Sequence, residues 1–289
     1  MSWAERADAA QGVLVGQFWD GRRGLYRVTP GRRIFPTPQW HYWWQAHALD
    51  ATVDAVGRTG DAGGRERVRA HVAGVVRRNG GRIPNEYYDD MAWMALALLR
   101  ADEVAGVDTA GLVAELWADI RQGWDERHGG VVWDGIHPVT DPGPSRELYT
   151  YNQGTVVGAE VELWRITGDT GHRDRAERTA AAALARFTDP ASGLLPAEGA
   201  GDGGLFKGIL ARYLGELVRA VGPEPDQVTG AVLAVLRRNG EAVAAVPDRP
   251  VGADWRAPAG GDRSLSTHLS AVLLLEALAA VDPADSVGR

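Results

Sequence analysis

Cysteine is absent from the 289 residues, which excludes a disulfide framework, a cysteine-ligated zinc site and a thiol nucleophile. Basic residues are in the minority, since 31 Lys and Arg stand against 38 Asp and Glu and give a formal net charge of −7. Proteins that bind nucleic acid by neutralising its phosphates need positive charge at the contact. The acidic balance therefore argues against a nucleic-acid partner.

Long hydrophobic runs are also absent. The most apolar stretch, Leu269 to Val281, contains Glu276 and is shorter than the ~20 residues that a membrane-spanning helix needs. The first ten residues carry acids early and have no basic segment followed by an apolar one, so they do not resemble a signal peptide. We therefore expect no membrane partner and a cytoplasmic location, or a secreted one if a leader has been removed.

Helical spacing of apolar residues runs through most of the chain, and strand-like alternation is limited to residues 24–35 and 131–133. No linker or sharp change of composition divides the sequence, so we predict a single catalytic domain over residues 1–289. The spacing and the helix-stop signals predict about ten helices, over residues 2–18, 40–57, 62–79, 88–101, 108–122, 150–167, 171–187, 204–221, 225–239 and 265–281.

Two short strings recur and suggest how these helices are connected. Thr59-Gly60-Asp61 returns as Thr167-Gly168-Asp169, where Gly is expected to end one helix and Asp to begin the next. The string Arg-Arg-Asn-Gly occurs at residues 77–80 and again at 237–240, and is expected to end two other helices. Tight turns alternate with longer, glycine-rich and aromatic connections. This alternation predicts antiparallel helix hairpins arranged in a ring, with the long loops at one end.

The predicted helices are of two kinds. Those that begin at Asp61, Asp108 and Gly171 have a charged face, as expected of helices on the outside of a protein. The others are apolar or small nearly all round, as expected of inner helices, and begin at Trp40, Asp89, Tyr151, Phe206 and Ser266. We therefore predict an all-α fold, an α/α barrel or toroid of helix hairpins with an inner and an outer ring.

Two adjacent carboxylates, Asp89 and Asp90, open one of the inner helices, flanked by Tyr87, Tyr88 and Trp93. Aspartate is common at helix starts for structural reasons, because it meets free N–H groups and the positive end of the dipole. The other interpretation is a catalytic pair at the mouth of the barrel. Rotamers could place the two carboxyl groups about 5–7 Å apart, which fits a retaining glycosidase better than an inverting one. Repulsion between them would keep one protonated.

Aromatic residues accompany this pair, and the 11 Trp against 4 Phe are unusual. Flat rings edged by hydrogen-bonding groups bind the apolar faces of sugars, although indoles also fill protein cores. Asn152 and Gln153, before another inner helix, offer amides that suit sugar hydroxyls. The candidate site aromatics lie at the starts of inner helices or in long loops, and include Trp40, Trp44, Trp93, Trp133, Tyr151 and Trp255.

Lys207 could neutralise a carboxylate or touch a substrate, and a solvated role is the simpler alternative. The seven histidines are scattered and lack the spacing of metal ligands. We therefore expect no metal and no cofactor.

Several ordered motifs resemble glycoside hydrolase family 76, the bacterial and fungal endo-α-1,6-mannanases, over about residues 10–280. They are the strings YYDDMAW, TYNQG, WWQAHALD and FKG, the last with Arg212 one turn on, and a late Trp before a final helix rich in Ser, Thr and His. The resemblance implies an (α/α)6 barrel, which has twelve helices, and a retaining double displacement on α-1,6-linked mannose without a metal. Asp89 would be the nucleophile and Asp90 the general acid/base. The implied groove residues are Tyr88, Trp93, Tyr151, Asn152, Gln153, Lys207 and Trp255.

The expected partner is a mannose-containing oligosaccharide or glycan, bound by a monomer. Two other functions remain open at this point. A sugar epimerase or isomerase also uses an α/α barrel, but typically needs paired histidine bases, and only His41 and His268 are at hand. A carbohydrate-binding relic would keep the aromatic groove without turnover.

Overall fold

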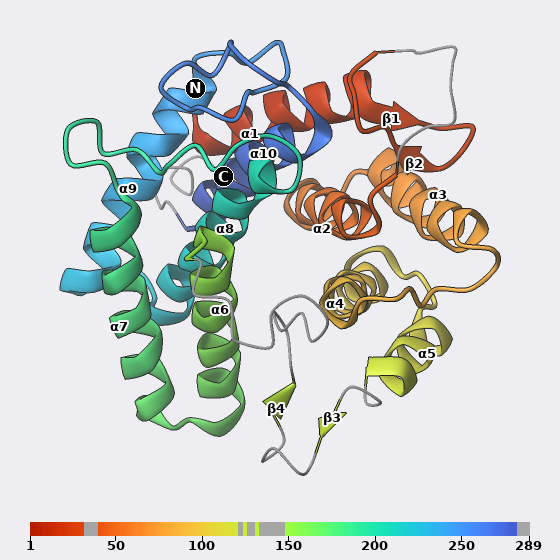
Figure 1. The fold of residues 1–289 in the computed structure, drawn as a ribbon, viewed down its shortest axis with the longest axis horizontal. Coiled ribbons are helices and arrows are strands. Elements are labelled where there is room, and N and C mark those ends of the chain that lie inside the picture. Colours follow the sequence, from red (N-terminus) through yellow and green to blue (C-terminus); the bar gives the residue numbers. More distant parts are fainter. Residues whose placement is uncertain (32–39, 121–123, 126–130, 133–147, 282–289) are drawn as a thin grey trace, which may run out of the picture. The chain divides into compact units, whose positions relative to one another are not determined.

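The computed structural model describes residues 1–31, 40–120, 124–125, 131–132 and 148–281 (Figure 1). Its contacts divide the chain into two compact units. The smaller unit comprises Trp19–Arg27 and Thr37–Leu148, and the larger unit comprises Met1–Phe18, Val28–Pro36 and Tyr149–Arg289. Each unit is described by itself below, and the single catalytic domain stays a prediction.

The smaller unit is built from two helix hairpins. Helices α2 (Tyr42–Thr59) and α3 (Ala62–Arg78) form the first hairpin, and α4 (Tyr88–Ala105) and α5 (Ala110–Ile120) form the second. Helix α2 also packs along α4, so that their facing side chains make the core of this unit. Two short antiparallel strand pairs complete it: β1 (Trp19–Asp20) with β2 (Leu25–Tyr26), and β3 (Trp124–Asp125) with β4 (Val131–Val132).

The larger unit holds the remaining helices of the described chain. Helix α1 (Trp3–Val13) continues into a π-helical turn, η1 (Leu14–Phe18). Helix α8 packs against both α6 and α10, while α7 packs against α6 and α9 packs against α8 (Figure 1). The bounds of these later helices are α6 (Thr150–Thr167), α7 (Thr170–Phe187), α8 (Gly203–Val221), α9 (Gln227–Ala244) and α10 (Leu265–Val281).

The predicted distinction between inner and outer helices is confirmed within each unit. Alternate helices in chain order pack on one another: α2 on α4 in the smaller unit, and α8 on both α6 and α10 in the larger unit. These are the helices predicted to lie inside. Of the 17 residues of α10, 13 are buried, whereas α7 buries only 3 of its 18. None of the helices in the described part of the chain combines the length and the apolarity needed to cross a membrane.

The repeated Thr-Gly-Asp string makes the same turn twice. Gly60 and Gly168 end their helices in the left-handed region, with φ of 69° and 72°. The aspartate that follows caps the next helix, because Asp61 accepts hydrogen bonds from the N–H groups of Gly63 and Gly64, and Asp169 accepts one from Gly171. The predicted role of this repeat is confirmed.

The second repeat behaves differently at its two sites. After Arg78, Asn79 is the C-cap of α3, as predicted, but α9 continues through Asn239 and Gly240 to Ala244, so the predicted end at 239 was wrong. The side chain of Asn239 is buried and accepts the N–H of Leu195 at 2.9 Å. A Cβ at Gly240 would lie 2.6 Å from the ring of Trp3. Asn239 and Gly240 therefore contact distant segments of the chain instead of ending a helix.

Glycines let the inner helices of the larger unit approach closely. A Cβ at Gly154 in α6 would lie 2.8 Å from the Cα of Leu210 in α8. A Cβ at Gly208 in α8 would lie 2.4 Å from the Cα of Ser270 in α10, and the N–H of Gly208 donates to the hydroxyl of Ser270 at 3.0 Å. Since backbone atoms cannot move aside as the end of a side chain does, these positions exclude any larger residue.

We expect Gly208→Ala to destabilise the protein by about 2–3 kcal/mol, because the methyl group must displace the backbone of α10. Gly230→Ala in α9 is the matched control: nothing lies within 4 Å of its Cβ position, so it should stabilise the protein by about 0.5–1 kcal/mol through helix propensity. Urea unfolding of both variants measures the difference. Equal effects of the two substitutions would contradict the close approach of α8 and α10.

A buried histidine links three segments of the larger unit. His268 in α10 is 1% exposed, its Nε2–H donates to the carbonyl of Ala10 at 3.0 Å, and its Nδ1 accepts the N–H of Val251 at 3.3 Å. Burial lowers the pKa of His268 to about 4, although the hydrogen bond to Ala10 opposes this. The ring is therefore neutral in the folded protein at pH 7.

We expect folding stability to fall as the pH is lowered from about 6.5 towards 4. The unfolded histidine binds a proton in this range and the folded one does not, so each unit of pKa depression is worth about 1.4 kcal/mol, or about 3 kcal/mol for His268. Urea unfolding at pH 7 and pH 4.5 should show a smaller pH effect in His268→Gln. The control Ser270→Ala, which removes a buried hydroxyl that does not titrate, should keep the wild-type pH effect.

Candidate functional site

The two predicted aspartates lie in the first turn of α4. Its N-cap, Tyr87, has extended backbone angles and makes no side-chain capping hydrogen bond. Asp89 is exposed and Asp90 is half-buried. Negative charge is favoured at this place because the first turn has free N–H groups and the positive end of the helix dipole.

Asp90 is held by residues from outside the helix. The amide Nδ2 of Asn85 donates to Oδ2 of Asp90 at 2.7 Å, and Oδ1 of Asn85 accepts the N–H of Tyr87 at 3.1 Å. Burial, and after it the negative charge of Asp90, raise the pKa of Tyr42, whose hydroxyl donates to the carbonyl of Ile83 at 2.6 Å. No sequence signal indicates these roles of Asn85 and Tyr42, because both depend on how the loop before α4 folds.

The loop before the aspartates is itself anchored to the end of α3. The side chain of Asn79 donates to the carbonyl of Pro84 at 2.7 Å, and reaches those of Arg82 and Ile83 at 3.3 Å each. One amide group thus satisfies carbonyls along the segment that leads to Asn85.

Aromatic residues gather at the starts of α2 and α4. Trp44 is buried and stacks on His41, with ring centroids 4.1 Å apart. Trp93 is half-buried and lies 4.8 Å from the ring of His47, and Trp40 is half-buried and meets the ring of Tyr42 edge-on. Of the other predicted aromatics in this unit, Trp133 and the side chain of Tyr88 lie outside the described part of the structure.

In the larger unit the predicted residues come together at the starts of α6 and α8. Tyr151, Asn152 and Gln153 form the first turn of α6, and each is half-buried. The ring of Tyr151 packs against Phe206, with centroids 4.6 Å apart. Lys207, the next residue of α8, is 1% exposed.

The ammonium group of Lys207 lies 4.4 Å from the ring centre of Trp255, which is 1% exposed. The indole N–H of Trp255 is buried and has no acceptor among the described residues. Burial lowers the pKa of Lys207 to about 8, although the charges of Glu198 and Asp254 oppose the shift. Burial also raises the pKa of Glu198, a residue that no sequence motif indicates.

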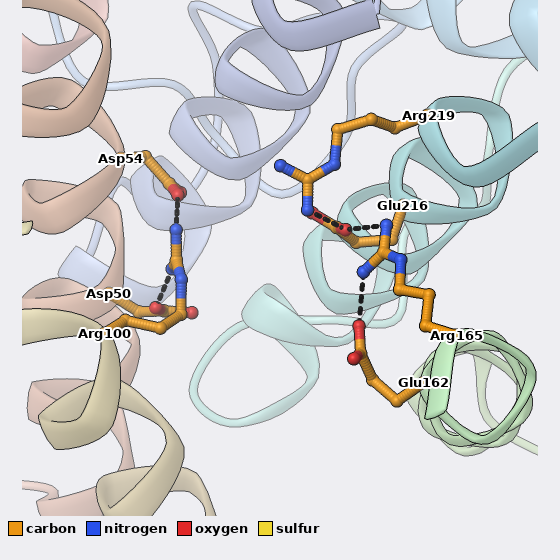
Figure 2. A network of polar contacts seen from close by, with 7 residues as sticks. All are labelled: Asp50, Asp54, Arg100, Glu162, Arg165, Glu216 and Arg219. Carbon is orange, nitrogen blue, oxygen red and sulfur yellow. Dashed lines mark hydrogen bonds and ion pairs between the residues drawn. The ribbon is translucent and has the colours of Figure 1, made fainter. Parts of the chain in front are cut away.

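Ion pairs connect the same inner helices farther along their length (Figure 2). In the smaller unit Arg100 of α4 pairs with Asp50 and Asp54 of α2. In the larger unit Glu216 of α8 accepts from Arg165 of α6 at 3.1 Å. The first turns of these helices carry aromatic and amide side chains in place of ion pairs. In each unit the side chains suited to a sugar therefore lie at the N-terminal ends of the inner helices.

The family model of glycosyl hydrolase family 76 matches residues 2–142 and 132–286. The chain belongs to this family. It is a glycoside hydrolase, as its motifs suggested, and family membership does not favour the epimerase or the relic.

Solved structures agree with the family match. The α-1,6-mannanase GH76A from Salegentibacter sp. HEL1_6 is 26% identical, with a TM-score of 0.85 over 97% of this chain and 100% of that one. An inactive variant of that mannanase, with two adjacent aspartates replaced by alanine, is solved in complex with α-1,6-mannotetrose; it is 25% identical, with a TM-score of 0.85 over 98% of this chain and 100% of that one.

The unsaturated glucuronyl hydrolase from Bacillus sp. GL1, at 14% identity and a TM-score of 0.58 over 99% of this chain and 98% of that one, shares the fold alone. No curated protein sequence matches the chain. Together the structural matches confirm the α/α-barrel fold class of this family 76 enzyme.

We expect Asn79→Ala to destabilise the enzyme by about 1–2 kcal/mol, because the partly buried carbonyl of Pro84 loses its donor and that of Ile83 keeps only the hydroxyl of Tyr42. Hydrogen exchange measured by mass spectrometry should increase over residues 82–87. The control is Arg82→Ala in the same loop: its side chain is 69% exposed and makes only surface ion pairs, so a change within about 0.5 kcal/mol is expected. Unchanged exchange in Asn79→Ala would show that the loop is held by other contacts.

Proposed function

We propose that this glycoside hydrolase cleaves α-1,6-mannosidic linkages by a retaining double displacement, with Asp89 as the nucleophile and Asp90 as the general acid/base. The observation that carries the proposal is the pair of adjacent aspartates at the start of α4, one exposed and one half-buried. The mannanase relative that binds α-1,6-mannotetrose is inactive when two adjacent aspartates are replaced, which supports the same chemistry here.

In the first step a carboxylate oxygen of Asp89 attacks C1 of the mannosyl residue, while Asp90 gives its proton to the departing glycosidic oxygen. The C1–O bond breaks, and a covalent β-mannosyl ester of Asp89 forms. In the second step a water oxygen attacks C1, its proton passes to Asp90 and the ester bond breaks. The released sugar keeps the α configuration.

The surroundings of the two carboxyl groups suit this division of labour. Asp89 is exposed and lies at the positive end of the helix dipole, where the charged form of a nucleophile is stabilised. Asp90 is oriented through one oxygen by Asn85, and a carboxyl group bound in this way can carry its proton on the other oxygen. Repulsion between neighbouring carboxylates favours protonation of one of them.

The sugar-binding part of the proposal rests on the first turns of the inner helices. The half-buried Trp40 and Trp93 offer aromatic faces, and Asn152 and Gln153 offer amides that donate to and accept from hydroxyl groups. Tyr88, Trp44, Trp133, Tyr151 and Trp255 complete the proposed set, and Lys207, which is 1% exposed, supports it through the backbone segments that it holds.

We expect wild-type enzyme to release manno-oligosaccharides from α-1,6-mannotetrose, and Asp89→Asn and Asp90→Asn each to lower the rate about 1,000-fold or more. The control Asp102→Asn changes an exposed aspartate in the last turn of the same helix and should leave the rate unchanged. Turnover by both first-turn variants at the wild-type rate would refute the assignment. Cleavage of other mannosidic linkages but not of this one would refute the linkage.

Azide distinguishes the two roles when an activated aryl α-1,6-mannobioside is the substrate. In Asp89→Ala, azide replaces the nucleophile and should give the β-mannosyl azide. In Asp90→Ala, azide attacks the covalent intermediate and should give the α-mannosyl azide. The opposite pair of products, identified by NMR, would exchange the roles, and a β-configured first product from the wild type would refute retention.

A further inference from the structure

The first turn of α6 is capped by a residue 48 positions away. The N-cap Tyr149 makes no side-chain capping hydrogen bond. Instead, the N–H of Thr150 donates to Oε1 of Glu198 at 2.9 Å, and the hydroxyl of Thr150 donates to Oε2 of the same carboxylate. Thr150 is fully buried. Glu198 therefore satisfies a donor at the helix start that would otherwise be buried without a partner.

Glu198 is itself fixed to α8 and, through the residues before it, to α9. A Cβ at Gly203, the first residue of α8, would lie 2.1 Å from the carbonyl oxygen of Glu198, so the absence of a side chain there allows the contact. Three residues before Glu198, the N–H of Leu195 donates to the side chain of Asn239 in α9. The carboxylate is thus presented to α6 by a segment with little freedom to move.

Lys207 also binds the segment that precedes Glu198. Its ammonium group donates to the carbonyl of Pro196 at 3.1 Å and to that of Ala253. It therefore joins the segment before Glu198 to the segment before Trp255. The charges that act on Lys207 are those of Glu198 and Asp254, which favour its charged form, and that of Arg256, which opposes it.

We propose that Glu198 and Lys207 are positioning residues, which hold the turn Tyr151–Gln153 in the orientation that binds the sugar. The proposal rests on the proposed function in one respect, that this turn binds mannose. A side chain that is 1% exposed and donates to two backbone carbonyls acts on the site through those segments and not by contact with a substrate. Charge matters because a charged acceptor gives a stronger hydrogen bond at a helix start than a neutral one.

The test is Glu198→Gln, which keeps the shape of the side chain and removes its charge. We expect KM for α-1,6-mannotetrose to rise about 5–10-fold, equivalent to about 1 kcal/mol, with kcat changed less than about 2-fold. Hydrogen exchange should increase over residues 150–154. The matched control is Glu224→Gln, an exposed glutamate between α8 and α9, which should change neither.

Three further variants separate positioning from a general loss of structure. Thr150→Val removes the hydroxyl donor but keeps the N–H and the volume, and should raise KM and local exchange less than Glu198→Gln does; Thr150→Ser should restore both to wild-type values. Lys207→Met should also raise KM. Loss of the proton of Lys207 weakens its hydrogen bonds to the carbonyls of Pro196 and Ala253, so KM should rise as the pH passes about 8. In Glu198→Gln this rise should begin at a lower pH, because Lys207 has lost a charge that favours its protonated form.

Unchanged exchange over residues 150–154 together with an unchanged KM in Glu198→Gln would overturn the proposal. If Glu198→Gln increases exchange in every helix, the milder Thr150→Val and Thr150→Ser pair decides, and equal KM values in that pair would also overturn it. If wild-type enzyme does not cleave α-1,6-mannotetrose, the proposed function fails. The exchange measurements, which need no turnover, then decide whether Glu198 and Lys207 hold the turn.

Discussion

Close packing between neighbouring inner helices is the constraint on which the rest of the larger unit depends. Gly154 in α6 and Gly208 in α8 bring backbone against backbone, and a single methyl group at either place would collide with the next helix. These close contacts fix where each helix lies along the axis of its neighbour. The first turns of α6 and α8 consequently lie together, and Tyr151 meets Phe206 there.

The same first turns raise a second physical requirement, because the leading N–H groups of a helix have no partners within it. Side chains from outside the helices supply acceptors at both places. Oδ1 of Asn85 accepts the N–H of Tyr87, the N-cap of α4, and Glu198 accepts the N–H of Thr150 at the start of α6. Loops therefore hold the first turns that carry the proposed site residues, while ion pairs such as Arg100 with Asp50 connect the helices farther along.

Much of the fold could be predicted because its signals are local. Helices α6 and α10 were predicted with their observed bounds, 150–167 and 265–281, from apolar spacing and from the residues at their ends. The turns at Gly60 and Gly168 depend on hydrogen bonds within a few residues, so the repeated string was enough to find both. The aspartates of the candidate site were found for the same reason, since their place at a helix start is visible in the sequence.

Tertiary structure alone decided what identical or inconspicuous residues do. Asn79 ends α3, whereas Asn239 lies within α9, because only the second is buried against Leu195 of another segment. Glu198 has no local sequence feature that indicates its hydrogen bond to Thr150. Lys207 has none that indicates its burial, which arises only when α8 packs against its neighbours. The sequence by itself predicted most of the helices, the Gly-Asp turns between them and the place of the adjacent aspartates at a helix start. Packing between residues far apart in the chain decided which polar groups are buried, since burial and its hydrogen bonds exist only once the helices have come together.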